Sequence, residues 1–297
     1  MSNDEAINPD SQNEETRIEK KAKRLTINTH LVTNIKLNHM NISITRGGFL
    51  TPSLGKTKLF FIALVLLLSS TTIKTLAQKE STNGTSVSTP PGTSKIWGKI
   101  DGVSIEGMVQ GPATEITPLQ VACVFEYTEG DIFNSPPALP AELNGMVHLD
   151  SALKGLITEI RKTGRFSGHA LETLLITPPK GMISAEKLLL IGLGDRNAFN
   201  PELLKAVGAV SMREALRLGV THYAFASDIK DAGIASPTGL VAGNVVRGAM
   251  SAYRTQSYLK TNGMGSFTPV TKLTLLAGMS FFEDAGEGIK AAISEFQ

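Results

Sequence analysis

Cysteine and tryptophan are scarce in this sequence. The chain of 297 residues has one of each. A single thiol, Cys123, excludes an internal disulfide and a site with several thiolate ligands. Cys123 lies within an apolar run, and no catalytic base is marked near it, so we interpret it as a buried strand thiol rather than a nucleophile.

The chain also has no large excess of charge of one sign, because it contains 29 Lys and Arg residues and 27 Asp and Glu residues. The net positive charge lies before residue 78, and the rest of the chain is slightly acidic. A nucleic-acid binder usually shows a basic face or stripe. The sequence therefore predicts no nucleic-acid partner.

The longest apolar run, residues 59–68, is too short to cross a bilayer, which needs about 20 apolar residues. Basic residues precede this run, and the small residues of Thr75–Ala77 follow it, as expected of a secretory signal peptide. We predict that residues 1–77 are a leader cleaved after Ala77, leaving no stable membrane span. The protein would then be periplasmic or extracellular. A buried helix or a signal anchor is the alternative, and the start codon could be that of Met1 or Met40.

After the leader, residues 78–99 are rich in Ser, Thr, Gly and Pro and predict a flexible linker. Residues 100–297 then alternate between patterns typical of strands and of helices. The predicted strands are 103–109, 119–127, 171–177, 187–191, 221–226 and 272–277. The predicted helices are 148–162, 201–218, 236–258 and 283–296. Strands 171–177 and 187–191 are short, mainly apolar runs, which predicts burial on both faces.

This order predicts a three-layer α/β/α domain with a mixed, mostly parallel sheet of about six strands and helices on both faces. The helix boundaries carry their own signals. Asn200 and Gly219 bracket the second helix as cap residues, and Ser236 before Pro237 predicts the start of the third.

Few residues in this domain are typical of a catalytic centre. The turn after strand 187–191 contains Gly192, Gly194 and Asp195, where backbone amides could hold a phosphate, although a tight structural turn explains it better. Asp228 and Asp231 follow the end of a strand, and we interpret them as solvated acids. The histidines after the leader (His148, His169 and His222) lack metal-ligand spacing. We therefore predict no catalytic residues, no metal ligands and no cofactor in this chain.

The long third helix resembles a helix of the leucyl (cytosol) aminopeptidases that reads roughly EG-x-x-L-A-x-Y-x-F-x-x-Y-K. The positions that match are Gly248, Ala252, Tyr253, Arg254, Tyr258 and Lys260. Upstream, residues 187–195 (KLLLIGLGD) are similar to the VGLG strand of that family. The sequence departs from the pattern at Asn244, near the usual acid, and at Thr255, which replaces an aromatic residue.

The resemblance covers the N-terminal domain of the family, which implies a macro-domain-like fold and an accessory role in assembly. The catalytic domain of the family holds two divalent metals, such as zinc or manganese, and contains an N-T-D-A-E-G-R run that this sequence lacks. We therefore expect an exported accessory domain whose partner is a second copy of itself or a peptidase chain. Two alternatives are a truncated or split aminopeptidase and a macro-domain-type binder of ADP-ribose or a related nucleotide, using residues 192–195 and 233–239.

Overall fold

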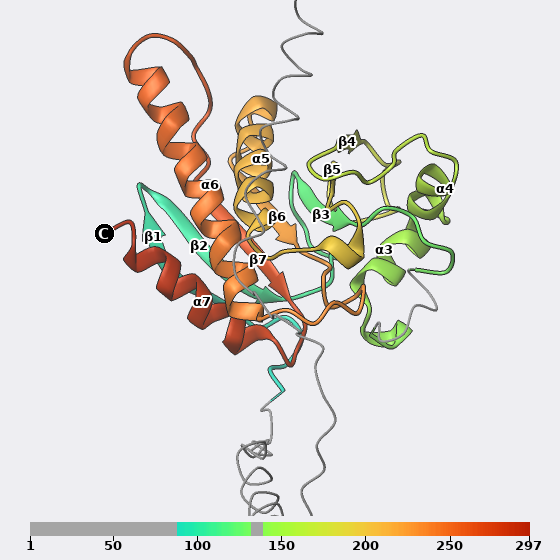
Figure 1. Ribbon diagram of the computed structural model, residues 1–297. Helices are drawn as coiled ribbons and strands as arrows, with labels where there is room; N and C mark the ends of the chain where they lie inside the picture. Colours follow the sequence, from blue (N-terminus) through green and yellow to red (C-terminus); the bar gives the residue numbers. More distant parts are fainter. Residues whose placement is uncertain (1–87, 132–138) are drawn as a thin grey trace, which may run out of the picture. The chain divides into compact units, whose positions relative to one another are not determined.

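The computed structural model describes residues 88–131 and 139–297 (Figure 1). The predicted leader and residues 78–87 of the predicted linker lie outside these residues. Within them, no helix is long and apolar enough to cross a membrane. The described residues belong to one compact unit.

A seven-stranded sheet in the order β1-β2-β7-β6-β3-β5-β4 forms the middle layer. The strands are β1 (Ser94–Ile100), β2 (Val103–Val109), β3 (Gln120–Val124), β4 (Thr173–Ile176), β5 (Leu188–Gly192), β6 (His222–Ala226) and β7 (Lys272–Ala277). The five inner strands are parallel, and β1 and β4 pair antiparallel at the two edges. The predicted α/β class and the mostly parallel sheet are confirmed.

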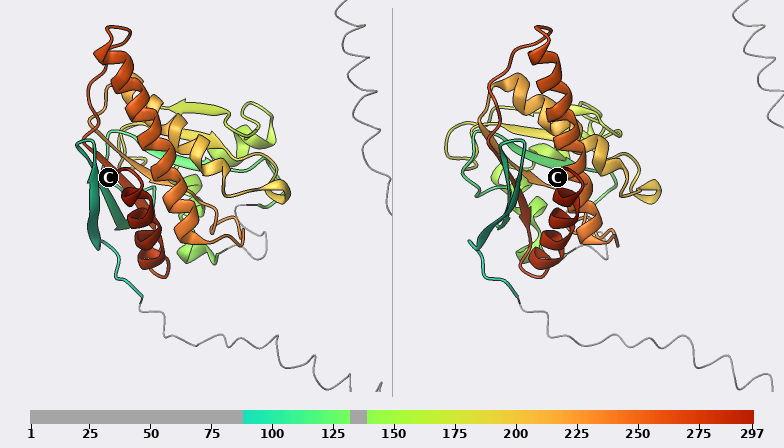
Figure 2. Two further views of the ribbon diagram at one scale, coloured as in Figure 1. Left: turned by 60° about the vertical axis from the view of Figure 1, so that its left-hand side comes forward. Right: turned by 90° about the vertical axis from the view of Figure 1, so that its left-hand side faces the viewer.

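The helices are α3 (Gly145–Ala152), α4 (Leu156–Lys162), α5 (Leu203–Leu218), α6 (Thr238–Thr261) and α7 (Phe282–Ser294), with short 3-10 turns at Ala141–Leu143 and Arg196–Ala198. One core packs sheet residues such as Ile105, Val121 and Phe225 against α5, α6 and α7. A second core packs the neighbouring residues of β3 and β5 against α3 and α4. Successive strand residues point to opposite faces, so the two cores follow directly from the apolar strands. Figure 2 shows α6 lying across the sheet beside α7.

Glycines allow the helices on the first face to approach closely. A Cβ at Gly248 of α6 would lie 1.8 Å from the Lys205 carbonyl oxygen of α5, and one at Gly208 would lie 2.2 Å from the Val245 carbonyl oxygen. The α5 and α6 backbones therefore touch at these two positions.

Four details of the prediction are wrong. The linker does not extend to residue 99, because β1 begins at Ser94 and adds a seventh strand by pairing with β2. The strand at 173–176 is not buried on both faces, because it is an edge strand with alternating exposure. The helix at 148–162 is two helices, interrupted where Lys154 and Gly155 adopt positive φ. The Ser236 hydroxyl does not cap α6, and it has no hydrogen-bond partner among the described residues.

Candidate functional site

A cavity of about 350 Å³ lies at the carboxyl ends of the parallel strands. The loops that follow β2, β6 and β7 border it, together with the first turns of α3, α6 and α7. Open α/β sheets bind ligands at this edge, and the volume falls in the range of small-molecule sites, which is about 300–1,000 Å³. The cavity is therefore the best-formed candidate site in the described part of the chain.

The walls of the cavity are mostly apolar. Val241, Ala242 and Val245 of α6 form one side, and Phe225 and Leu275 contribute from the strand ends. The polar side chains that line it are Gln110, Glu142, His148, Ser227, Asp228, Lys230, Asp231, Thr238 and Ser280. Most of these polar groups belong to the loop after β6 and to the segment around α3, so the cavity has one polar end.

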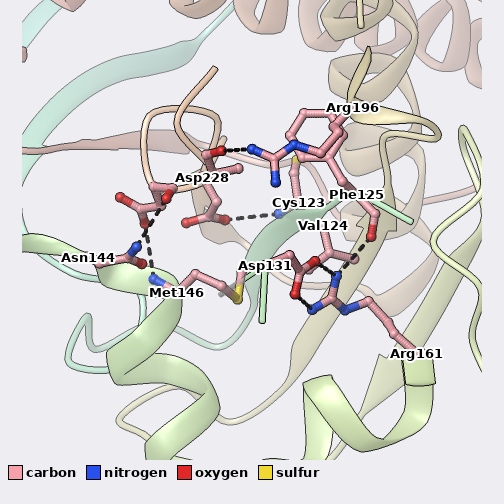
Figure 3. A pocket seen from close by; sticks show the side chains of 11 residues that line it. Cys123, Val124, Phe125, Asp131, Asn144, Met146, Arg161, Arg196 and Asp228 are labelled. Carbon is pink, nitrogen blue, oxygen red and sulfur yellow. Dashed lines mark hydrogen bonds and ion pairs between the residues drawn. The ribbon is translucent and has the colours of Figure 1, made fainter. Parts of the chain in front are cut away.

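Two aspartates of the loop after β6, Asp228 and Asp231, line this cavity, and Figure 3 shows Asp228 beside Cys123 of β3. Asp228 accepts a hydrogen bond from the backbone N–H of Cys123 on β3 at 3.0 Å. Asp231 accepts one from the backbone N–H of Met146 in the first turn of α3, also at 3.0 Å. The amide of Asn144 adds a bond to the Asp231 carbonyl oxygen at 3.1 Å. The pair thus joins the loop after β6 to both β3 and α3.

The pair retains a proton more strongly than isolated aspartates do. Burial raises the pKa of Asp228 well above its usual range, and the neighbouring charge of Asp231 raises it further. Burial also raises the pKa of Asp231, although hydrogen bonds from the Met146 and Gly145 amides oppose that rise. Two carboxyls in contact cannot easily both be ionised, so they titrate as one system. Asp228 is the member with the larger rise.

A second cavity, of about 30 Å³, lies on the β3 side of the pair (Figure 3). A buried ion pair borders it, in which the Arg161 guanidinium contacts the Asp131 carboxylate at 2.6 and 3.1 Å. Arg161 also donates to the Phe125 carbonyl oxygen at 3.0 Å. Arg196, on the 3-10 turn after β5, donates to the Ala232 carbonyl oxygen. The loop after β6 is therefore held from this side as well.

The predicted glycine turn lines neither cavity. A Cβ at Gly192 would lie 2.0 Å from the His169 carbonyl oxygen, so the neighbouring loop fills the space beside the turn. Gly194 adopts a positive φ of 77° and donates its N–H to the Gly168 carbonyl oxygen at 2.9 Å. Asp195 is exposed and accepts a hydrogen bond from the Asn197 amide at 2.9 Å. The other half of the predicted loop pair, residues 233–239, does reach the cavity at Thr238.

The three histidines do not converge. His148 lines the large cavity, His169 pairs with Glu126 on the surface at 2.7 Å, and His222 begins β6 at the opposite end of the strand. In residues 88–131 and 139–297, no group of three or more His, Cys, Asp or Glu side chains could hold a metal ion. Cys123 is buried, as predicted, and burial raises the pKa of its thiol well above the usual range.

The prediction of solvated acids is wrong in part, because Asp228 and Asp231 are half-buried and each accepts a hydrogen bond from a backbone amide. Their position after a strand end was visible in the sequence and is the one signal that pointed to a site. Their burial depends on α3, which begins more than 80 residues earlier and supplies the Met146 amide. No local pattern around Asp228 indicates that this helix covers it.

Comparison with known proteins places the domain in a family. Residues 132–262 match the N-terminal domain of the cytosol aminopeptidase family. The chain is 29% identical over 140 residues to a probable cytosol aminopeptidase of Roseiflexus castenholzii, covering 47% of this chain and 28% of that protein. It is 33% identical over 129 residues to a probable cytosol aminopeptidase of Alkaliphilus oremlandii, covering 43% of this chain and 25% of that one. The chain thus carries an N-terminal domain of the cytosol aminopeptidase family, as the resemblance predicted, and matches about a quarter of the length of these relatives.

Two solved structures are similar at low identity. A tomato leucine aminopeptidase variant matches with a TM-score of 0.46 and 18% identity, covering 69% of this chain and 37% of that one. A variant of the Oceanobacillus iheyensis macrodomain matches with a TM-score of 0.44 and 16% identity, covering 68% of this chain and 99% of that one.

Proposed function

We propose that this protein is a non-catalytic accessory domain of the leucyl aminopeptidase type that acts by assembling with a peptidase chain or with further copies of itself. The observation that carries the proposal is that residues 132–262 match the N-terminal domain of the family. The sheet to which these residues contribute is covered on both faces. Such a domain has a core of its own and can present its surface to a partner.

The end of α6 is the surface that best suits such a contact. In Figure 1 it stands out beyond the sheet together with the loop that follows it. Tyr258 and Met264 lie there, and each is 67% exposed. Aromatic residues and Met are enriched at protein interfaces, whereas most large apolar side chains of this domain are buried.

A native pull-down of the protein from its source cells, with intact-mass analysis of the associated chains, tests the proposal. We expect a co-purifying chain that contains the N-T-D-A-E-G-R run, or a homo-oligomer. Tyr258→Glu should weaken the association at least tenfold, while Lys180→Glu, which places the same charge on an exposed loop, should leave it unchanged. A monomer without an associated peptidase contradicts the proposal.

The proposal also requires that the protein by itself be inactive as a peptidase. With zinc or manganese added, the purified chain should not hydrolyse leucine anilides. Turnover that scales with protein concentration and survives repurification would instead favour an active enzyme. A neighbouring reading frame that encodes the N-T-D-A-E-G-R run would favour the alternative of a split or truncated aminopeptidase.

We propose further that the protein is exported. The support is the apolar run 59–68 with its basic flank and the small residues before position 78. Intact-mass analysis of the protein from source cells should find Gln78 at the N-terminus. A mature chain that retains residues 59–68 contradicts cleavage at this position.

The cavity favours a second candidate function, the binding of a small ligand such as ADP-ribose or a related nucleotide. A ligand that binds only the folded state at a hundred times its Kd stabilises a protein by about 2.7 kcal/mol. ADP-ribose should therefore raise the melting temperature by several degrees in a concentration-dependent way. No shift at millimolar concentration excludes this ligand.

A further inference from the structure

The large cavity at the carboxyl ends of the strands has apolar walls that come from the sheet and from α6. Val109 of β2, Phe225 of β6 and Leu275 of β7 line it from the sheet. Val241 and Val245 line it from α6. Apolar surface gains free energy when it leaves water for walls of this kind. A ligand that fits the cavity, whose volume is about 350 Å³, therefore has an apolar body of small-molecule size.

The polar end of the cavity has hydrogen-bond acceptors that the described residues do not fill. Asp228 and Asp231 are half-buried and line the cavity. Asp228 accepts a hydrogen bond from the Cys123 amide, and Asp231 accepts one from the Met146 amide, each at 3.0 Å. An ionised carboxylate has about four lone-pair sites for such bonds. Most of the acceptor capacity of the two carboxylates is therefore open to a donor on a ligand.

The charged side chains that line the cavity favour a cation over an anion. Glu142 of the first 3-10 turn adds a third carboxylate to those of Asp228 and Asp231. Lys230 also lines the cavity, but its Nζ donates to a backbone carbonyl oxygen of the same loop at 2.6 Å. His148 is exposed and adds positive charge only when it is protonated. A positively charged ligand group would therefore be attracted to the polar end.

The aromatic side chains of the cavity are also compatible with a cation. Phe225 and Phe281 both line it. The face of an aromatic ring attracts a cation that lies within about 6 Å of the ring centroid. The Lys230 ammonium lies 5.6 Å from the centroid of the Phe281 ring, so one ring of this cavity already has a cation beside it.

We propose that the cavity binds a small apolar primary amine. The protonated nitrogen of the ligand contacts the carboxylates of Asp228 and Asp231, and its apolar body lies against Val241 and Val245 of α6. An ammonium group has three N–H donors, which is enough to reach both carboxylates. This inference concerns the cavity and does not depend on assembly with a peptidase. It differs from the nucleotide candidate in the charge of the ligand, so titrations with both kinds of ligand separate the two.

The ionisation of the two carboxyls determines the pH of the test. Burial raises the pKa of Asp228 and of Asp231, and a cation beside them favours their ionised form. At pH 8 the two carboxyls are more fully ionised than at lower pH. The amine also remains protonated there, because the pKa of an alkylammonium group lies well above this value. Binding is therefore measured at pH 8.

Isothermal titration calorimetry of the purified full chain tests the proposal with three probes that share one apolar body. Phenylbutylamine carries the ammonium, phenylbutanol replaces it with a neutral hydroxyl, and phenylbutyric acid replaces it with a carboxylate. We expect the amine to bind at least about tenfold more tightly than the alcohol, which is the usual effect of a hydrogen bond to a charged group. The acid should bind more weakly than the alcohol.

Three results of these titrations would overturn the proposal. One is an amine that does not bind at millimolar concentration. Another is an amine that binds no more tightly than the alcohol, and the third is an acid that binds as tightly as the amine. None of them affects the proposed assembly, which the pull-down tests at the end of α6.

Asp228→Asn and Asp231→Asn each remove one negative charge at nearly constant volume. Each should weaken binding of the amine by about tenfold and leave binding of the alcohol nearly unchanged. Asp195→Asn is the matched control, because Asp195 is exposed and lines neither cavity, and it should change neither affinity. The two cavity variants are independent, so the test remains valid if one of them does not fold. A preference for the amine that persists in both, or that falls equally in Asp195→Asn, refutes the site.

The position of the apolar body is tested separately by nuclear magnetic resonance of the amide signals during titration with the amine. The signals of Val241 and Val245 should shift as the ligand binds, because their side chains line the cavity. Gly263, which follows α6 and lines neither cavity, is the control and should not shift. Saturable binding that leaves the signals of Val241 and Val245 unchanged would place the amine elsewhere and overturn the proposal.

Discussion

The buried ion pair between Arg161 and Asp131 allows a quantitative test of how α4 is held to the sheet. The Arg161 side chain is 1% exposed and that of Asp131 is 10% exposed. Replacing Asp131 by Leu leaves an uncompensated guanidinium in this position, which costs about 3–5 kcal/mol. For a domain of this size, each kcal/mol shifts the melting temperature by roughly 2–4 °C. The variant should therefore melt about 6–20 °C below the natural protein.

The double variant with Arg161→Met distinguishes pairing from simple packing. Replacing both partners with apolar residues is often neutral or stabilising, apart from about 1 kcal/mol for the Phe125 carbonyl oxygen that loses its donor. We therefore expect the double variant to recover most of the loss, which gives a coupling energy of at least about 2 kcal/mol.

Urea unfolding followed by circular dichroism, at low and high salt, measures this cycle. The coupling should barely change with salt, because buried pairs are weakly screened. The exposed pair of Lys205 and Glu202, 2.7 Å apart, is the matched control and should show a coupling of about 0.5 kcal/mol or less that falls with salt. Additive losses at Asp131 and Arg161 would refute this account.

Three further outcomes are expected. Gly248→Ala should destabilise the protein by about 1–3 kcal/mol in urea unfolding, because its Cβ meets the Lys205 carbonyl oxygen. Gly265→Ala is the control and should change stability by less than about 0.5 kcal/mol. Equal effects of the two substitutions would contradict the close helix crossing. Asp150→Ala should cost about 2 kcal/mol, because its carboxylate accepts two amide hydrogen bonds at the start of α4; a loss below about 0.5 kcal/mol would mean that water replaces the cap. The Cys123 thiol should react with alkylating reagents more than about a hundredfold more slowly in the folded protein than in urea, and rapid native labelling would show that its strand is accessible.

The class of the fold was predictable because its inner elements carry strong local signals. β5 is apolar at every position and is buried throughout, as the sequence indicates. Gly219 ends α5 in the left-handed conformation that its position predicts, with a φ of 69°. β7 has the predicted bounds. Buried parallel strands and amphipathic helices owe their pattern to residues within the element, so these elements can be predicted from the local sequence.

The edges of the sheet were harder to predict because their pattern depends on a neighbour. β1 contains Trp97 between Ile96 and Gly98, and it becomes a strand by pairing with β2 and packing Trp97 against Phe282 of α7. The break between α3 and α4 is likewise stabilised by Asp150, whose carboxylate caps α4 from the preceding helix. Both features arise from contacts between elements rather than from periodicity.

The sequence by itself determined the layered α/β class, the buried thiol and the resemblance to the N-terminal domain of the family. Apolar periodicity and the order of motifs depend on residues close together in the sequence, so they can be recognised without the tertiary structure. The tertiary structure alone decided where a site could lie. It filled the space beside the Gly192 turn with a neighbouring loop and placed the Met146 and Cys123 amides against two acids. A carboxyl retains its proton because of what surrounds it in space, and segments distant in the sequence supply those surroundings.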